Sequence, residues 1–558
     1  MGLTSSEQRI KLPLGEFGAG GGAELTGKAV GSVRRLLFAL FLLQAATSVL
    51  AADPFQTPAL SVARVEWRAV LDQMRTEISA VPAVAADFSF ALQRRVPASD
   101  MRSMPALVQL NAVTSPIFAG IARSPVPVLL PFDAAAFIEA QRTGHEVGVS
   151  LSRYQADFRP VDLFEAGPAG YDAVFSFEPG AGAGMPQRTF ARPVEVHITG
   201  SLLIYEVPDP QAGKGEPVKS LAAQYPDLRR FIREGYVRYA FTRFGAPYVV
   251  SIQCLDTAPR PRRLACREAY PVAERFLRAL HVAGGRPSRP RIDIPAGLVE
   301  RPLEPSADFT YRPPGNIIMG SGYHRQVGRA DFNAYSQIRF PTEAPAFVHS
   351  QSFGRRGASD KSDKPNATYP WRDNFCEVRS FEVGQCASGF GHQGEDIRAA
   401  ACSAKKEGMD ACDPKLRPVF AVRDGVLIRS VKQQAATLQV NSRTEHIRFR
   451  YMHMNPSAMD SDGVLNGRHL AEGEKLGVVS NYLDHPNGTS RHLHFDVQVF
   501  TRDGWIWVNP YVTLIAAYER LTRGRGHEIG PEIAAVPAVA RAMPADAVHP
   551  DPEEGSEN

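Results

Sequence analysis

Two histidine motifs, far apart in the sequence, constrain this chain more than any other feature. His492 and His494 form an HxH motif, and His392 with Asp396 forms an HxxxD motif. Side chains alternate along a β-strand, so an HxH on a strand presents both imidazoles on one face. Three protein ligands can be assembled from one of those imidazoles, the imidazole of His392 and the carboxylate of Asp396. A catalytic zinc has three protein ligands and leaves its fourth tetrahedral position to water. The motifs therefore predict a β-fold with a hydrolytic zinc site.

The residues around the motifs agree with this interpretation. Gly391 and Gly394 flank His392 and let the backbone turn tightly toward a metal. Four segments predict β-structure: a strand, a turn at Asp424-Gly425 and a second strand within 418–428, an alternating strand at 449–454, a turn and short strand at 473–480, and a long strand at 488–499. Either histidine motif alone is weak, so the prediction depends on their joint order and context.

In this order and spacing the segment resembles the LytM/lysostaphin-type zinc metallopeptidases of bacterial cell walls. The resemblance covers the C-terminal third of the chain, and its motifs stand as His392-Gln-Gly-Glu-Asp396, Val419-Phe-Ala421 with Asp424-Gly425-Val426, Tyr451-Met-His453-Met454, and His492-Leu-His494-Phe-Asp496. It implies a mainly antiparallel β domain that holds one Zn²⁺ per chain. It also implies that His392, Asp396 and His494 bind the metal, and that His453 and His492 are the two catalytic histidines that do not.

The chemistry of zinc gives those two histidines a task. Zinc lowers the pKa of bound water from about 15.7 toward about 7 and polarises a carbonyl group. A protein group must then hold the developing oxyanion and move protons to the leaving amine, and imidazole titrates in the range that this requires. We expect His453 and His492 to share these tasks, and the sequence does not assign one task to each.

Other interpretations are disfavoured by particular residues. Some relatives of this family lack metal ligands and only activate amidases, whereas all five site positions are filled here. A zinc site of the D-alanyl-D-alanine carboxypeptidase type has a longer His-to-Asp spacing and a Glu shortly before its last His, and residues 488–491 contain no Glu. A lone His is more often a structural residue with a hydrogen bond, which is what we expect of His145, His197, His281, His324, His446, His469 and His485.

The N-terminus and the cysteines predict export. Arg34-Arg35 precede the apolar run 36–43, and small residues suited to cleavage follow up to Ala51 and Ala52. The stretch before Arg34 is unusually long, and a start at Val30 would give a signal of ordinary length. The six cysteines fall into neighbouring pairs, which in an oxidising compartment predicts the disulfides Cys254–Cys266, Cys376–Cys386 and Cys402–Cys412. The segment 401–416 is then a disulfide-stiffened loop beside the cleft.

Length and composition predict several domains. The chain has 558 residues, of which 44% are hydrophobic and 22% charged. We expect a signal peptide with an extended N-terminus over 1–52, an α+β domain of unknown function over 53–300, a linker over 301–345, a LytM-like zinc peptidase domain over 346–520 and a disordered tail over 521–558. Within the α+β domain the patterns predict β-structure at 107–132 and 144–177, paired strands at 193–199 and 201–207, a helix at 225–241, a strand at 248–254 and a helix at 268–282.

These observations together predict an exported zinc-dependent endopeptidase of the periplasm or cell envelope. Its substrate would be the peptide stem or cross-bridge of peptidoglycan, with zinc-activated water as the nucleophile and a protein regulator as a possible partner. The net charge of +4 is mild and gives no reason to expect nucleic acid as a partner. No second apolar run reaches membrane-spanning length, so no span is expected after signal cleavage. The alternative is a catalytically silent scaffold that binds the wall or activates amidases.

Overall fold

The fold is described from a computed structural model. The structure describes residues 56–79, 106–137, 154–178, 190, 193–254, 264–288, 309–315, 330–342, 346–348, 371–377, 379, 381–399, 418–480 and 492–530. The predicted signal sequence, residues 531–558 of the predicted tail, the Cys402–Cys412 pair and the loop 401–416 lie outside these ranges, whereas residues 521–530 of that tail are described and include a strand at Gly526–Glu528. None of the helices within these ranges has the length and apolar character that a bilayer span requires.

The described residues form mostly antiparallel β-structure with few helices, and the first of two large sheets has seven strands. Their order is β3-β4-β5-β10-β9-β8-β7. The bounds are β3 (Phe158–Gly167), β4 (Gly170–Phe177), β5 (Glu195–Ser201), β7 (Glu216–Pro217), β8 (Arg229–Arg233), β9 (Tyr236–Arg243) and β10 (Ala246–Gln253). Alternate residues share a face, so Val237 and Tyr239 of β9 enter the main core of this sheet while Ala240 packs on its other face.

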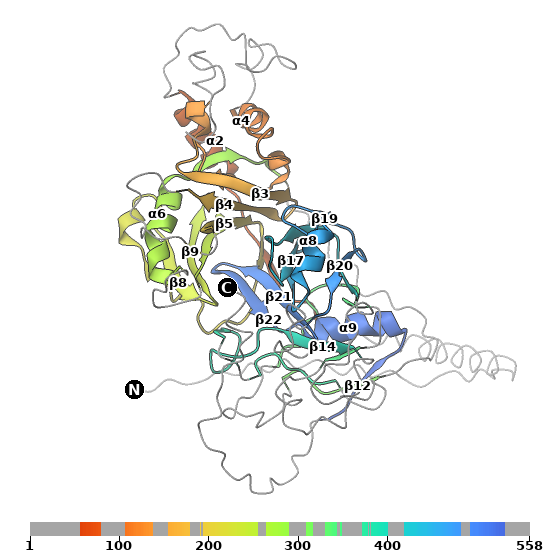
Figure 1. The fold of residues 1–558 in the computed structure, drawn as a ribbon. Helices are drawn as coiled ribbons and strands as arrows, with labels where there is room; N and C mark the ends of the chain where they lie inside the picture. The colour runs from red at the N-terminus through yellow and green to blue at the C-terminus, as the bar shows by residue number, and fades with distance from the viewer. Residues whose placement is uncertain are drawn as a thin grey trace, which may run out of the picture. The chain divides into compact units, whose positions relative to one another are not determined.

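Helices and short strands complete that core (Figure 1). They are β1 (Leu60–Val62), α2 (Trp67–Ser79), α4 (Ala106–Thr114), η1 (Ile121–Arg123), β2 (Val128–Leu130), β6 (Leu203–Tyr205), η3 (Lys219–Leu221), η4 (Cys266–Ala269), α6 (Tyr270–Arg278) and β11 (His281–Gly284). Helix α6 buries Val272, Ala273, Phe276 and Leu277, which one face of a helix presents together. The predicted disulfide Cys254–Cys266 is present beside it.

Several predictions for this half are wrong in type or partner. The predicted helix at 225–241 is the hairpin β8–β9, whose turn residues Glu234 and Gly235 both have positive φ, 54° and 73°. A two-residue turn of that kind matches the twist of paired strands. The segment 107–132 contains α4 as well as a strand, and the helix predicted at 268–282 ends at Arg278 before β11. The strands at 193–199 and 201–207 exist, but β5 pairs with β4 and β10, and β6 pairs with β1.

The second large sheet carries the histidine motifs. Its order is β13-β14-β21-β18-β17-β16-β19, with β22 also paired to β21. The bounds are β13 (Ala346–Val348), β14 (Glu395–Ala399), β16 (Gly425–Ile428), β17 (Ala436–Asn441), β18 (His446–Met452), β19 (His469–Leu470), β21 (Leu493–Thr501) and β22 (Gly504–Val508). The four predicted strand segments are confirmed as far as they are described, with residues 488–491 lying outside the described ranges. However, β15 (Pro418–Phe420) pairs with β20 (Lys475–Val478) rather than with β16.

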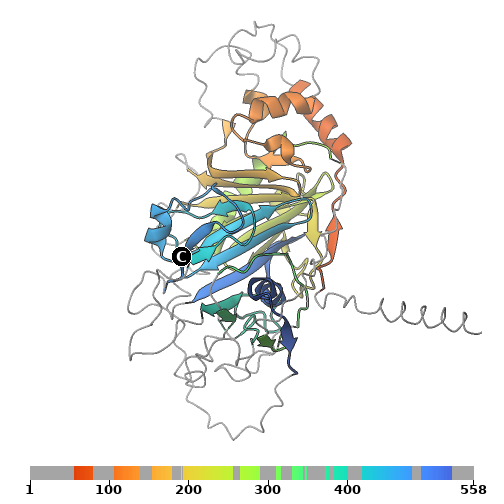
Figure 2. The same ribbon diagram turned by 90° about the vertical axis from the view of Figure 1, so that its right-hand side faces the viewer.

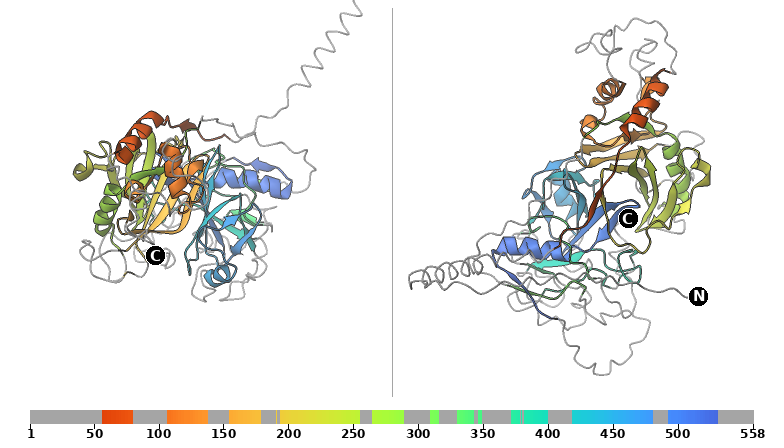
Figure 3. Two further views of the ribbon diagram at one scale, coloured as in Figure 1. Left: turned by 90° about the horizontal axis from the view of Figure 1, so that it is seen from above. Right: turned by 180° about the vertical axis from the view of Figure 1, so that it is seen from behind.

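Helix α9 (Tyr511–Thr522) closes the core of the second sheet, and Figures 2 and 3 show it beside the strands from three further sides. A small helix, α8 (Pro456–Ser461), is capped at its N-terminus by Asn455, whose side chain accepts from the Ala458 backbone N–H. Strand β12 (Phe309–Tyr311) pairs in parallel with β23 (Gly526–Glu528). Phe309 and Phe340, both from the segment 301–345, pack on the buried Trp371 and Tyr518.

A buried polar network joins the two sheets. Asp172 of β4 accepts hydrogen bonds from Thr199 of its own sheet at 2.5 Å and from Arg448 of β18 at 3.0 Å. It also lies 2.7 Å from Nε2 of His446, whose other ring nitrogen lies 2.8 Å from the Ser201 hydroxyl. His446 is therefore a structural residue, as predicted. Beside the network, Phe500 and Trp505 of the second sheet pack on Ala240 and Val249 of the first.

Candidate metal centre

Strand pairing brings the two motifs together. Strand β14 lies antiparallel to β21 with Asp396 opposite His494, and β18 on the other side of β21 places Met452 opposite His494. His392 stands in the loop before β14. Gly394 is needed in that loop, because a Cβ there would lie 2.4 Å from the carbonyl oxygen of Phe495.

The three predicted ligands converge at atomic distances. Nε2 of His392 lies 2.9 Å from Nδ1 of His494, and Oδ1 of Asp396 lies 3.3 Å from the former and 3.2 Å from the latter. Tetrahedral ligands at bond lengths of about 2.0–2.1 Å stand about 3.3 Å apart. All three side chains are buried, and Oδ2 of Asp396 is buried without a hydrogen-bond partner. This donor set fits a small divalent cation.

Contacts behind the histidines determine which nitrogen of each faces the centre. Nδ1 of His392 lies 3.0 Å from the carbonyl oxygen of Asn374, which can only accept, so Nδ1 carries the proton and Nε2 keeps the lone pair. Nε2 of His494 lies 3.5 Å from Oδ2 of Asp496, which leaves Nδ1 toward the centre. Such outer contacts orient metal-binding histidines and fix their tautomers.

The charges of the centre favour a cation. Burial lowers the pKa of His392 to about 4, so its lone pair is available at neutral pH. Burial alone would raise the pKa of Asp396, but His392 and His492 outweigh it and hold that pKa well below its ordinary value. Burial also lowers the pKa of His494, but hydrogen bonds to Asp396 and Asp496 outweigh it and raise that pKa to about 9. A metal ion bound there would compete with protons for the same ring nitrogens.

The other two predicted histidines lie against the ligands. The rings of His453 and His492 stand 4.7 Å apart, and the ring of His453 stands 6.0 Å from that of His494. Nε2 of His492 lies 3.3 Å from Oδ1 of Asp396. Burial is the main cause that lowers the pKa of His453 well below its ordinary value, and the neighbouring His492 and His494 lower it further. All five predicted residues therefore meet in one place, each at most 6% exposed.

The Cys376–Cys386 loop supports His392. The predicted disulfide is present, and the Cys376 N–H donates to the carbonyl oxygen of His392 at 2.8 Å. The His392 N–H donates in turn to the carbonyl oxygen of Glu377 at 2.6 Å. A Cβ at Gly391 would lie 2.8 Å from both Cα of Cys376 and Sγ of Cys386, so only glycine lets the two segments approach this closely.

Sequence reasoning missed three residues around the centre. Asp496 stands two positions after His494, so strand alternation places it on the same face and could have revealed it. Gln434 contacts His453 from the loop before β17, and no local pattern points to it. Asn374 acts through its backbone carbonyl on His392, and its side chain accepts from the Asp396 N–H at 3.3 Å.

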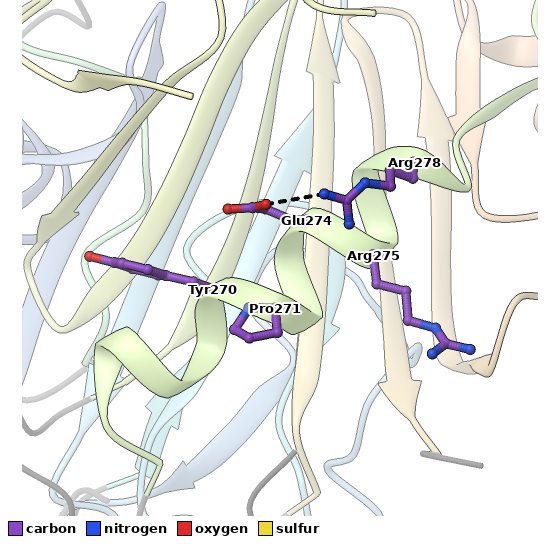
Figure 4. Close-up of a pocket in the computed structure, with 5 residues that line it drawn as sticks. All are labelled: Tyr270, Pro271, Glu274, Arg275 and Arg278. Carbon is purple, nitrogen blue, oxygen red and sulfur yellow. Dashed lines mark hydrogen bonds and ion pairs between the residues drawn. The ribbon is translucent and has the colours of Figure 1, made fainter. Parts of the chain in front are cut away.

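The structure also has a surface hollow apart from these residues. It has a volume of about 390 Å³ and is lined by Tyr270, Pro271, Glu274, Arg275 and Arg278 of α6. Figure 4 shows Glu274 paired with Arg278 while Arg275 points to another side of the helix. None of the five histidine-motif residues lines this hollow.

Comparisons with known proteins return little. No protein-family profile matches the chain, and no curated protein matches it. One region resembles a crystal structure described as a candidate glycyl-glycine endopeptidase LytM from Ruminococcus gnavus, with 22% sequence identity, a TM-score of 0.17 and coverage of 24% of this chain. The match spans 49% of that protein's chain. A likeness of this strength does not establish a function for this chain.

Proposed function

We propose that this protein is an exported zinc-dependent endopeptidase that hydrolyses peptide bonds in peptidoglycan stem peptides or cross-bridges. The observation that supports the proposal most is the convergence of two imidazole nitrogens and one carboxylate oxygen within about 3.3 Å of one another. The disulfides Cys254–Cys266 and Cys376–Cys386 agree with export to an oxidising compartment.

The residues of the site have distinct tasks in this reaction. His392, Asp396 and His494 would hold the metal, and Asp396 would offset part of its charge. A bound zinc activates water and polarises the scissile carbonyl as a Lewis acid. His453 and His492 would accept the proton from the attacking water, stabilise the developing oxyanion and return a proton to the leaving amine. General acid–base groups of this kind contribute about 10²–10⁴-fold to rate.

The burial of the site favours a second candidate function. His492 and His494 are only 1% and 2% exposed, although a peptide substrate has to reach them. A catalytically silent scaffold that binds the wall or activates amidases would need no such access. This candidate keeps the same fold and the same metal centre.

One digestion experiment separates the two candidates. The zinc-loaded protein is incubated with purified wall sacculi, with and without chelator, and the released fragments are identified by mass. The endopeptidase predicts chelator-sensitive fragments with new amino termini, which disappear in His494→Ala and His453→Ala variants. His469→Ala is the matched control, because His469 is exposed on β19 of the same sheet. Sacculi that bind the protein but stay intact would refute the endopeptidase and favour the scaffold.

A further inference from the structure

His453 is held in an unusual backbone conformation. It follows β18 with φ at 64°, in the left-handed region that few residues other than glycine adopt. Its carbonyl oxygen accepts from the Ser480 N–H at 2.8 Å. Residues held in such conformations are strained and occur often at active sites. The contacts that hold His453 in place therefore merit a functional explanation.

Gln434 makes two of those contacts with a single oxygen. Its side-chain Oε1 accepts from the backbone N–H of His453 at 2.9 Å and lies 3.1 Å from Nδ1 of the same residue. A backbone N–H can only donate, so the atom facing it must be the amide oxygen of Gln434. The ring nitrogen beside the same oxygen must then carry a hydrogen. In its neutral form, His453 therefore has its lone pair on Nε2.

We propose that Gln434 is a positioning residue that fixes the Nδ1–H tautomer of His453. The proposal rests on the proposed function, because it gives His453 one defined proton-accepting atom, Nε2, for the hydrolytic reaction. Gln434 is 4% exposed and contacts His453 rather than the three metal ligands. Its loss should change the orientation and tautomer of one imidazole and leave the metal in place.

If Gln434 only held its loop in place, its backbone would be sufficient for that role. The backbone carbonyl of Gln434 already accepts from the Met454 N–H at 3.3 Å, which joins the two segments whatever side chain stands at position 434. The side-chain oxygen adds a contact to the His453 ring that this backbone bond does not provide. A role in holding the loop alone would not require that ring contact.

The test compares Gln434→Ala and Gln434→Glu with the matched control Gln439→Ala. Gln439 is also a buried glutamine, on β17, but it donates to Asp172 in the junction between the sheets. Proteins labelled with ¹⁵N in histidine report the protonation of each ring nitrogen by NMR. A His453→Gln variant identifies the His453 signals. This readout needs neither zinc nor activity.

In the wild type and in Gln439→Ala we expect Nδ1 of His453 to be protonated and Nε2 bare. In Gln434→Ala we expect a mixture of tautomers, and Gln434→Glu, which keeps an acceptor oxygen, should restore the wild-type pattern. With zinc loaded, kcat on wall fragments should fall about 10–100-fold in Gln434→Ala while KM and zinc affinity stay near wild type. Gln434→Glu should recover most of that loss.

Two results would overturn the proposal: a bare Nδ1 in the wild type, or an unchanged tautomer in Gln434→Ala. A wild-type protein that cleaves no wall fragment would refute the proposed function instead. The NMR result would still decide whether Gln434 fixes the tautomer of His453. The two failures are therefore distinguishable.

Discussion

Asp496 offers the sharpest test of the candidate metal centre, because it touches the proposed ligand His494 without being a proposed ligand itself. Its Oδ2 lies 3.5 Å from Nε2 of His494 and accepts from Nε of Arg450 at 2.6 Å, while Oδ1 accepts from Nε1 of Trp507 at 3.2 Å. The substitution Asp496→Asn keeps the shape of the side chain and removes the charge that orients His494. The His494 ring would then be free to take the tautomer that turns a protonated Nδ1 toward the metal.

The geometry sets the size of the effect. Removing an outer contact of a metal-binding histidine costs about 10–100-fold in metal affinity. The contact of 3.5 Å is longer than the usual 2.9–3.0 Å for such a bond, and Arg450 already engages the same oxygen. We therefore expect a loss of zinc affinity at the lower end of that range, about tenfold, which corresponds to about 1.4 kcal/mol of binding free energy.

Zinc affinity of the metal-free protein is measured by competition with a chromogenic chelator. Asp172→Asn is the matched control, because Asp172 is an equally buried carboxylate that bonds an arginine and a histidine in the sheet junction. We expect it to destabilise the fold and to leave zinc affinity unchanged. This role of Asp496 is refuted if Asp496→Asn binds zinc as tightly as the wild type, or if Asp172→Asn weakens zinc binding equally.

Three further predictions concern the disulfides, the pH dependence and the metal. Replacing Cys376 and Cys386 by Ser should weaken zinc binding about tenfold, because their loop supports a metal ligand, whereas replacing Cys254 and Cys266 should not; the chelator competition measures both. Burial raises the pKa of Glu165 to about 7, so the folded protein holds that proton more tightly than the unfolded chain and stability falls as pH rises from about 4.5 to about 7. Glu165→Gln should remove about 1–2 kcal/mol of this fall between about pH 5 and about pH 8 in urea unfolding, and an unchanged slope would contradict the assignment. Chelator should lower the melting temperature, and zinc at about 100 times its Kd should restore about 2.7 kcal/mol; equal melting with and without zinc would exclude a site in the folded state.

The site was predictable from the sequence because its parts follow strand geometry. His492 and His494 stand at alternate positions, and the pairing of β14 with β21 brings Asp396 opposite His494. Strand alternation accounts for the shared face of His492 and His494. The meeting of Asp396 with His494 joins residues 98 positions apart, and the sequence indicates it only through the resemblance to a family of zinc metallopeptidases. The contact of Gln434 with His453 depends instead on where a loop meets the end of another strand, and no spacing in the sequence records that meeting.

The first sheet was harder to predict for a related reason. The segment 225–241 has apolar residues at spacings that suit a helix, yet it folds as β8 and β9. Glu234 in a left-handed conformation begins the turn, and an ordinary residue at that position gives no warning of it. Arg233 and Arg238, on the two strands that flank the turn, form ion pairs with Glu234 and help to hold this conformation.

The network around Asp172 has a consequence for how this protein can be divided. A fragment that begins after the first sheet would place Phe500 and Trp505 in water and would leave His446 without its carboxylate. Such a fragment would tend to aggregate, whatever the state of its histidine motifs. The half of this chain that carries the candidate metal centre therefore depends on the preceding half to keep these residues buried and paired.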